Sequence, residues 1–205
     1  MKKIQDILTF LQRSNELKSV PRYGSSLRHD ADTVAEHSWR LVLMAYIIVR
    51  ECKVPVDLNR VTAIALLHDL AEAKTGDVDA YAVITGQKSL AEKKYDETEA
   101  MHTLTQGLSF GGWVYDTWQE YEDQITLEAK FVKALDKIEA FLHIAECGVQ
   151  AYIPKEFHAD YADKAVQAFD EASQNFPEVK DLLNLVKGDL KQQFEAAGVK
   201  WISSV

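Results

Sequence analysis

Hydrophobic and polar positions along the chain repeat with the period of an α-helix. Near the N-terminus, apolar side chains recur at spacings of three and four residues, which places them on one stripe of a helix over residues 2–17: Ile4, Ile7, Leu8 and Leu11. The same period returns further along, and no segment alternates as a strand does. We therefore expect further helices over about 33–52, 58–74, 88–107, 114–146, 159–175 and 178–196.

Residues that start or stop helices set the ends of these segments. Thr33 followed by Glu36 forms a capping box, and Asp57 can cap the next helix. Pro21 and Gly24 interrupt the chain before Thr33. No repeat or linker divides the chain, so the sequence predicts one all-α domain over residues 1–205, packed as a helical bundle with polar outer faces. Further breaks are expected at Val54-Pro55, at Gly76 and at the SFGG segment 109–112.

The composition and net charge of the chain limit which kinds of partner the protein can bind. The chain has 205 residues, the length of one domain, and a net charge of −9. An acidic protein is a poor partner for polymeric nucleic acid, but it can bind a small phosphorylated ligand where a metal supplies positive charge. Cys52 and Cys147 fit no CxxC pattern, so we expect buried free thiols. The longest apolar run, 41–49, is shorter than the roughly 20 residues that span a bilayer, so we expect a cytoplasmic protein without a membrane partner.

Three of the predicted helices place acids or histidines beside apolar runs. His68 and Asp69 follow VTAIALL, His37 stands one turn before LVLMAYIIV, and Asp136 lies beside an apolar stripe in FVKALDKIEAFL. An unpaired charge in such surroundings is costly, so these groups indicate a shared divalent cation. Two imidazoles and two carboxylates would fill four positions around it and leave two positions of an octahedron open.

Each of these residues also has an ordinary explanation when taken alone. A single helical histidine is more often a surface or hydrogen-bonded core residue than a metal ligand, and an acid on a charged helix is usually solvated. We expect His102 and His158 at the surface, and His143 in the core or behind the site. Lys74 and Arg40 are expected to be solvated charges. The joint pattern on three helices, rather than any one residue, indicates the metal site.

The segments AEHSWR, LLHDLAEAKTGD and ALDKIEA resemble the HD superfamily of metal-dependent phosphohydrolases. The similarity is to its small single-domain branch, which contains the bacterial 5′-deoxynucleotidases and their archaeal and eukaryotic relatives. It implies a metal-site core over about 15–150, followed by C-terminal helices over about 159–196. The implied metal is Mn²⁺ or Co²⁺, although Fe²⁺, Ni²⁺ and Zn²⁺ also suit such a site. The implied metal ligands are His37, His68, Asp69 and Asp136.

The resemblance also implies roles for residues around the metal. Glu72 and Asp77 match the acids beside the attacking water and the substrate, and we expect them to be catalytic. Arg22 matches an arginine that contacts the substrate phosphate. Tyr23 stands where deoxynucleotidases that exclude ribonucleotides carry a tryptophan, so the sugar preference stays open.

The expected function is a metal-dependent phosphohydrolase that converts (deoxy)nucleoside 5′-monophosphates to nucleoside and phosphate, with a homodimer as a possible assembly. One arginine, Arg22, and one metal neutralise a single phosphate dianion. The alternatives are another HD phosphoesterase or a non-catalytic metal- or ligand-binding module. The phosphoesterases considered are a dNTP triphosphohydrolase, a cyclic-nucleotide phosphodiesterase and a guanosine tetraphosphate hydrolase. A purely structural metal site would have no use for Glu72 and Asp77.

Overall fold

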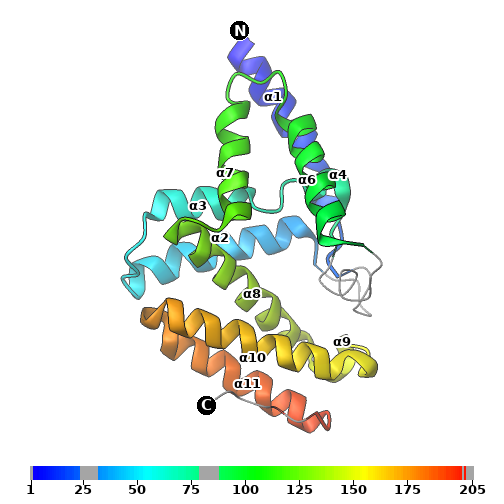
Figure 1. Ribbon diagram of the computed structural model, residues 1–205, viewed down its shortest axis with the longest axis vertical. Helices are drawn as coiled ribbons and strands as arrows, with labels where there is room; N and C mark the ends of the chain where they lie inside the picture. The colour runs from blue at the N-terminus through cyan, green and yellow to red at the C-terminus, as the bar shows by residue number, and fades with distance from the viewer. Residues whose placement is uncertain (1, 24–31, 79–87, 200, 202–205) are drawn as a thin grey trace.

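The computed structural model describes residues 2–23, 32–78, 88–199 and 201, and within them every regular element is helical (Figure 1). The all-α prediction is therefore confirmed, while the predicted break at Gly24 lies outside the described residues. In chain order the elements are α1 Lys2–Ser14, the 3₁₀ helix η1 Asn15–Ser19, α2 Val34–Glu51, α3 Leu58–Leu67, α4 Glu72–Thr75, α6 Leu90–Thr105, α7 Gly111–Asp123, α8 Leu127–Cys147, α9 Val149–Tyr152, η2 Lys155–Phe157, α10 His158–Asn175, η3 Pro177–Val179 and α11 Lys180–Ala196.

The predicted caps start α2 and α3. The Thr33 hydroxyl accepts a hydrogen bond from the backbone N–H of Glu36, and the Glu36 carboxylate accepts one from the N–H of Thr33. The Asp57 carboxylate accepts hydrogen bonds from the N–H groups of Asn59 and Arg60. These bonds satisfy donors that a helix start leaves without a partner. They fix where each helix begins, and α2 begins so that His37 lies in its first turn.

Two predicted helices are broken in the structure. The expected helix over 114–146 is two helices, because Gln124 adopts a left-handed conformation with φ 51° and Thr126 caps a new start. Neither residue is a glycine or proline, so the break had no strong sequence signal. The expected helix over 58–74 ends at Leu67, and the chain turns before α4. His68 and Asp69 therefore lie in a turn at the end of a helix.

Helix α8 is the centre of the architecture. It packs against α2, α3 and α7 on one side and against α10 and α11 on the other (Figure 1). The core formed at these contacts excludes water from large side chains of all these layers, which is the main source of stabilisation in such a bundle. The consequence is that residues in the middle of α8 face both halves of the molecule. Fully buried members of the core include Leu41, Ile64, Phe131, Leu135 and Phe169.

The apolar stripe of α1 does not face the core. The helix contacts the body with another face, where the Asp6 carboxylate accepts a hydrogen bond from the N–H of Ser109 at 2.9 Å and Phe10 packs edge-on against Phe110. The expectation of polar outer faces is therefore wrong here, because α1 is held by polar bonds and one aromatic contact. The α1 stripe is exposed: Ile4 74%, Ile7 44%, Leu8 48% and Leu11 60%.

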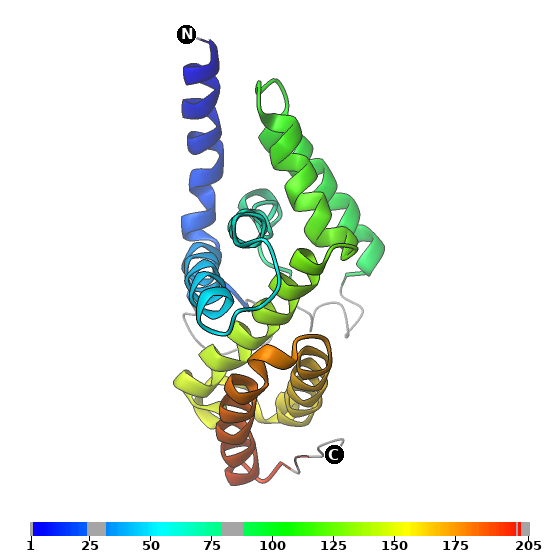
Figure 2. The same cartoon turned by 90° about the vertical axis from the view of Figure 1, so that its left-hand side faces the viewer.

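A second apolar stripe is exposed on α2. Its residues recur at helical spacing on the side opposite the core-facing Leu41, and they define the α2 stripe: Trp39, Leu43, Tyr46 and Ile47. Both α1 and α2 lie along the left edge of Figure 2. Monomeric proteins rarely expose large apolar patches without a use, so each stripe is a candidate contact surface.

The structure also tests what we expected of two histidines and two cysteines. His102 is exposed as predicted, but His158 is buried, because it begins α10 and its Nε2–H donates to the carbonyl of Ile153 at 2.8 Å. The cysteines are free as predicted but not buried, since Cys52 is partly exposed and Cys147 lies exposed in the last turn of α8. No helix within the described ranges is long and apolar enough to cross a membrane.

Candidate metal centre and active site

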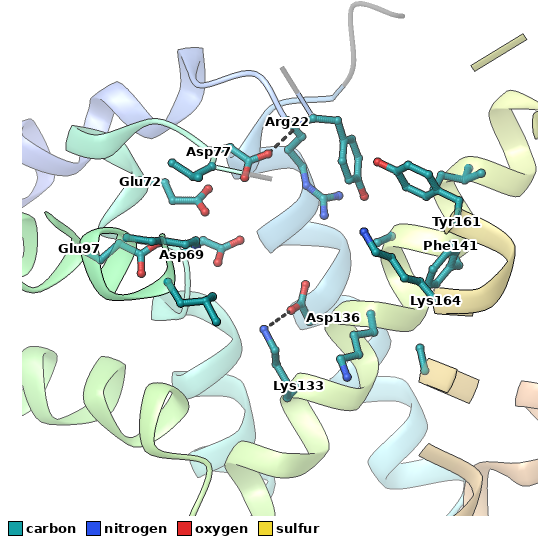
Figure 3. Close-up of a pocket in the computed structure, with 18 of the residues that line it drawn as sticks. Arg22, Asp69, Glu72, Asp77, Glu97, Lys133, Asp136, Phe141, Tyr161 and Lys164 are labelled. Carbon is teal, nitrogen blue, oxygen red and sulfur yellow. Dashed lines mark hydrogen bonds and ion pairs between the residues drawn. The ribbon is translucent and has the colours of Figure 1, made fainter. Parts of the chain in front are cut away.

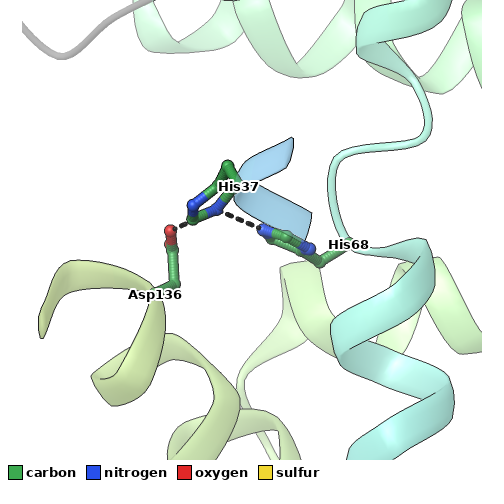
Figure 4. A group of neighbouring side chains, drawn as sticks. All are labelled: His37, His68 and Asp136. Carbon is green, nitrogen blue, oxygen red and sulfur yellow. Dashed lines mark hydrogen bonds and ion pairs between the residues drawn. The ribbon is translucent and has the colours of Figure 1, made fainter. Parts of the chain in front are cut away.

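The structure brings donor atoms of three predicted metal-binding residues within 4.8 Å of one another, and the fourth residue, Asp69, lies against the two histidines. His37 comes from the first turn of α2, His68 from the turn after α3 and Asp136 from the middle of α8 (Figure 4). Asp69 follows His68 in the same turn. His37 Nε2 lies 3.2 Å from His68 Nε2 and 3.2 Å from Asp136 Oδ1. Asp69 Oδ2 lies 3.0 Å from His68 Nε2 and 3.6 Å from His37 Nε2. Three chain segments that are distant in sequence therefore share one centre.

The spacing of these donor atoms fits one divalent ion. Nitrogen and oxygen ligands lie about 2.1 Å from a transition metal, so neighbouring ligand atoms lie about 3 Å or slightly more from one another. The observed separations of 3.0–3.6 Å match this arrangement. His37, His68 and Asp136 also satisfy the geometric requirement that one donor atom of each lies within 4.8 Å of the others. The set can hold a metal ion.

Hydrogen bonds behind the two histidines turn their Nε2 atoms toward this centre. The Nδ1–H of His68 donates to the backbone carbonyl of Ala65 at 2.9 Å, and the Nδ1–H of His37 donates to the Glu139 carboxylate. Such partners fix the tautomer of a metal-binding histidine, because the proton stays on the nitrogen away from the metal. Each imidazole thus offers a lone pair to the centre.

The electrostatics of the centre favour a positive charge. Without a metal ion, burial and Arg22 oppose protonation of His37, but hydrogen bonds to Asp136 and Glu139 raise its pKa to about 9. A bound cation would take the place of the proton on Nε2. Burial also opposes ionisation of Asp136, yet Lys133 and the histidines hold its pKa well below the usual value. The hydroxyl of Tyr121 donates to Asp136 Oδ2 at 2.6 Å, which leaves Oδ1 for the centre.

A cavity of about 750 Å³ opens beside the centre, and its size is typical of small-molecule sites. It runs between α4 and α6 on one side and α8 and α10 on the other. The first side carries most of the acids together with two lysines, whereas the second combines apolar side chains with lysines. Figure 3 shows Asp69, Glu72 and Asp77 on the first side, facing Phe141, Tyr161 and Lys164 on the second.

Both predicted catalytic acids line this cavity. Glu72 begins α4, and burial together with Asp69 and Asp77 holds its pKa well above the usual value. The Asp77 carboxylate accepts a hydrogen bond from the backbone N–H of Tyr23 at 2.8 Å. Asp77 thus fixes the segment that carries Arg22.

Arg22 and Tyr23 also line the cavity. The Arg22 guanidinium donates to the Glu139 carboxylate at 3.0 Å, and its central carbon lies 4.5 Å from the centre of the Tyr23 ring. The Tyr23 hydroxyl is buried and has no hydrogen-bond partner among the described residues. Tyr23 adopts a left-handed conformation with φ 57°. The ring therefore supports the arginine, and its hydroxyl is buried.

Sequence reasoning missed some residues of the site. Glu139 is fully buried behind His37, and its position three residues after Asp136 places both on one face of α8. That spacing was a signal that could have identified it. Tyr161 and Lys164 of α10 had no such signal, and they extend the cavity beyond the predicted core of about 15–150.

The remaining polar residues near the site have ordinary partners. Lys74 and Arg40, expected as solvated charges, form ion pairs with Glu16 and Glu146. His143 is partly buried and lies 3.1 Å from the Tyr152 hydroxyl, as expected for a residue behind the site.

Comparison with known proteins gives consistent results. A family model described as HD domain matches residues 14–180. The 5′-deoxynucleotidase HDDC2 of Homo sapiens is 32% identical over 197 residues, covering 94% of this chain and 90% of the relative. A structure described as a predicted metal-dependent phosphohydrolase from Magnetospirillum magnetotacticum MS-1 aligns with a TM-score of 0.71 at 20% identity, over 94% of this chain and 97% of that one. The HD phosphohydrolase DatZ of cyanophage S-2L, bound to dA and one catalytic Zn²⁺ ion, aligns with a TM-score of 0.56 at 20% identity, over 90% and 94%.

The geometry of the centre predicts the effect of removing one charge. Asp69→Asn keeps the shape of the side chain but removes a negative ligand, so bound divalent metal should fall to a small fraction of that in the wild-type protein. Metal content after dialysis, measured by inductively coupled plasma mass spectrometry, reports the change. Asp116→Asn on the exposed face of α7 is the matched control and should keep its metal. Equal metal contents in the two variants would show that Asp69 is not a ligand.

Proposed function

Because the chain belongs to the HD domain family, we propose that it is a metal-dependent phosphohydrolase that converts deoxynucleoside 5′-monophosphates to nucleosides and inorganic phosphate. The observation that carries this proposal is the convergence of donor atoms from His37, His68 and Asp136, with Asp69 against the two histidines. This cluster lies beside a cavity that also contains Arg22, Glu72 and Asp77. The match to a curated 5′-deoxynucleotidase over most of both chains supports the substrate class.

In this proposal His37, His68, Asp69 and Asp136 hold one divalent ion. The ion, when bound, lowers the pKa of a coordinated water toward about 7 and offsets negative charge on the phosphoryl oxygens. Mn²⁺ or Co²⁺ is the proposed metal, because the resemblance favours these ions and a set of two imidazoles and two carboxylates suits them. The catalytic Zn²⁺ ion of the DatZ complex keeps Zn²⁺ among the candidates, together with Fe²⁺ and Ni²⁺.

The proposed roles of the other residues follow from their positions. Arg22 contacts a phosphate placed next to the centre, because its guanidinium lines the cavity and is held from behind by Glu139. Glu72 orients the attacking water and exchanges a proton with it, since its buried carboxyl lies next to Asp69. Asp77 steers the leaving oxygen and keeps the Tyr23 backbone in place.

The nucleoside is proposed to lie against the apolar wall of α8 and α10, where Phe141 and Tyr161 line the cavity. Two lysines of the cavity already have acidic partners. Lys93 pairs with Glu97 at 2.6 Å, and Lys133 pairs with Asp136 at 3.2 Å. The cavity also holds Asp69, Glu72 and Asp77, and three phosphates would add more negative charge beside these acids than one, which favours a monophosphate over a triphosphate.

The role of Glu72 can be separated from metal binding. Glu72→Gln keeps the size of the side chain but cannot exchange a proton, so kcat for dAMP should fall by roughly 10²–10⁴-fold while metal content stays at the wild-type level. Steady-state phosphate release and metal analysis on the same sample measure both. Glu99→Gln, on an exposed position of α6, should change neither. Loss of metal in parallel with rate would make Glu72 a ligand instead.

The phosphate and sugar preferences form a second test. We expect dAMP to have a higher kcat/KM than dATP, and a deoxy preference over AMP that is weaker than in relatives with a tryptophan at the position of Tyr23. Tyr23→Trp should raise the dAMP/AMP ratio of kcat/KM, because a larger ring takes up space beside the substrate. Tyr95→Trp, exposed on α6, is the control. A preference for dATP would contradict the phosphate argument, and an unchanged ratio would place Tyr23 away from the sugar.

We also propose a homodimer formed through the α1 and α2 stripes. A helix of 13 residues is marginal in water by itself, and α1 leaves its apolar stripe exposed while its polar face holds the body. A second copy fits this surface, because a twofold axis would place one stripe of each protomer against a stripe of the other.

The single domain over residues 1–205 remains a proposal, and the cytoplasmic location stays a prediction from the sequence.

Charge placed in the stripes tests the dimer. Leu8→Glu combined with Leu43→Glu should shift the mass measured by light scattering from two chains to one, because the charges would be buried in the interface. Leu185→Glu on α11, which is 74% exposed, should leave the mass unchanged. A wild-type protein that is monomeric at micromolar concentrations would rule out this assembly.

A further inference from the structure

Glu139 lies behind the candidate site and contacts two of its residues at once. It is on α8, and its side chain is fully buried. Its Oε2 atom accepts a hydrogen bond from Nδ1–H of His37 and another, at 3.0 Å, from the guanidinium of Arg22. One oxygen atom therefore connects a proposed metal ligand with the proposed phosphate contact.

The second oxygen of Glu139 is in a different situation. Oε1 is buried and has no hydrogen-bond partner among the described residues, and the nearest ion-pair partner is Arg40 Nε at 3.8 Å. A buried carboxylate oxygen without a hydrogen bond costs free energy that a smaller or apolar residue would avoid. The negative charge of Glu139 is therefore better explained by the two groups that Oε2 holds, His37 and Arg22, than by a gain in the free energy of folding.

We propose that Glu139 is a positioning residue that prepares the metal half and the phosphate half of the site together. Its carboxylate keeps the proton of His37 on Nδ1, so that Nε2 faces the metal, and it orients Arg22 from behind. A charged acceptor makes stronger hydrogen bonds than a neutral one, so the negative charge matters at both ends. The inference rests on the proposed function, because it concerns the same metal and the same phosphate.

Glu139→Gln separates charge from shape. The amide oxygen can replace Oε2 and accept both hydrogen bonds, while the amide nitrogen replaces Oε1, which has no bond to lose. Glu146→Gln is the matched control: it lies on the same helix and also pairs with an arginine, but at the surface, where Arg40 donates to it. Arg22→Gln removes the proposed phosphate contact but leaves the hydrogen bond between Glu139 and His37 in place.

The first measurement uses the metal without any nucleotide. Titration of the metal-free proteins with Mn²⁺, followed by the electron paramagnetic resonance of the free ion, should give a Kd about 10–100-fold higher for Glu139→Gln than for wild type. Arg22→Gln and Glu146→Gln should bind Mn²⁺ with nearly wild-type Kd. This readout does not depend on hydrolysis, so it tests Glu139 even if the proposed substrate is wrong. Wild-type turnover of dAMP, run in parallel, tests the function separately.

The second measurement is kinetic, at saturating Mn²⁺. The bound ion then holds His37, so kcat of Glu139→Gln should return close to that of wild type, whereas KM for dAMP should stay raised because Arg22 has lost its anionic partner. Arg22→Gln should raise KM in the same direction. Wild-type Mn²⁺ affinity and wild-type KM in Glu139→Gln would overturn the proposal, as would a change in only one of them.

Stability is measured on the same samples, because a buried substitution can also unfold the protein. Thermal unfolding in the presence of a chelator shows whether Glu139→Gln is folded before metal is added. If it is not, Glu139→Asp is used instead, since it keeps the charge but cannot reach both partners. Because this shorter side chain can keep at most one of the two contacts, it should weaken Mn²⁺ binding, raise KM for dAMP, or do both. Wild-type values for both quantities would overturn the proposal.

Discussion

Carboxylates and imidazoles placed within about 3 Å of one another inside a helical bundle require a positive charge between them. This constraint governs the rest of the structure. The donors come from α2, from the turn after α3 and from α8, so these three elements have to pack correctly before the centre exists. Their backing groups, Ala65 for one histidine and Glu139 for the other, belong to the same elements. The core between α2, α3 and α8 and the proposed chemistry therefore depend on the same contacts.

The all-helical fold and the proximity of His37, His68 and Asp136 could be predicted because both rest on signals within short segments. Helical periodicity covers ten or more residues, and the acids and histidines stand out against apolar neighbours. The turn after Leu67 was missed because the sequence there contains no glycine or proline, although that turn is what directs His68 and Asp69 to the same point. The contribution of α10 to the cavity could not be predicted, since it depends on how α10 packs against α8. The direction of the α1 stripe was unpredictable for a similar reason, because Asp6 and Phe10 hold the helix by contacts with residues about 100 positions away.

The site has two parts, the metal centre with its acids and an apolar wall. The centre and its acids come from the α2, α3, α4 and α8 region, and the apolar wall comes partly from α10. Changes in α10 can therefore alter which nucleoside fits without moving the metal donors. This division is consistent with the general observation that one fold can carry related activities on different substrates. In this chain Tyr161 and Lys164 are the α10 positions labelled at the cavity in Figure 3.

The order of the donors along the chain has a consequence for biosynthesis. His37, His68 and Asp69 leave the ribosome well before Asp136, which stands at position 136 of 205. A growing chain thus carries three donors that cannot yet form the centre, while the apolar face of α2 that will pack on α8 has no partner. Domains fold as units once their interacting parts are available, and exposed apolar surface before that point favours aggregation. The emergence of α8 is therefore the step at which all segments of the centre can first meet, and translation that stalls before it would leave an apolar face of α2 exposed.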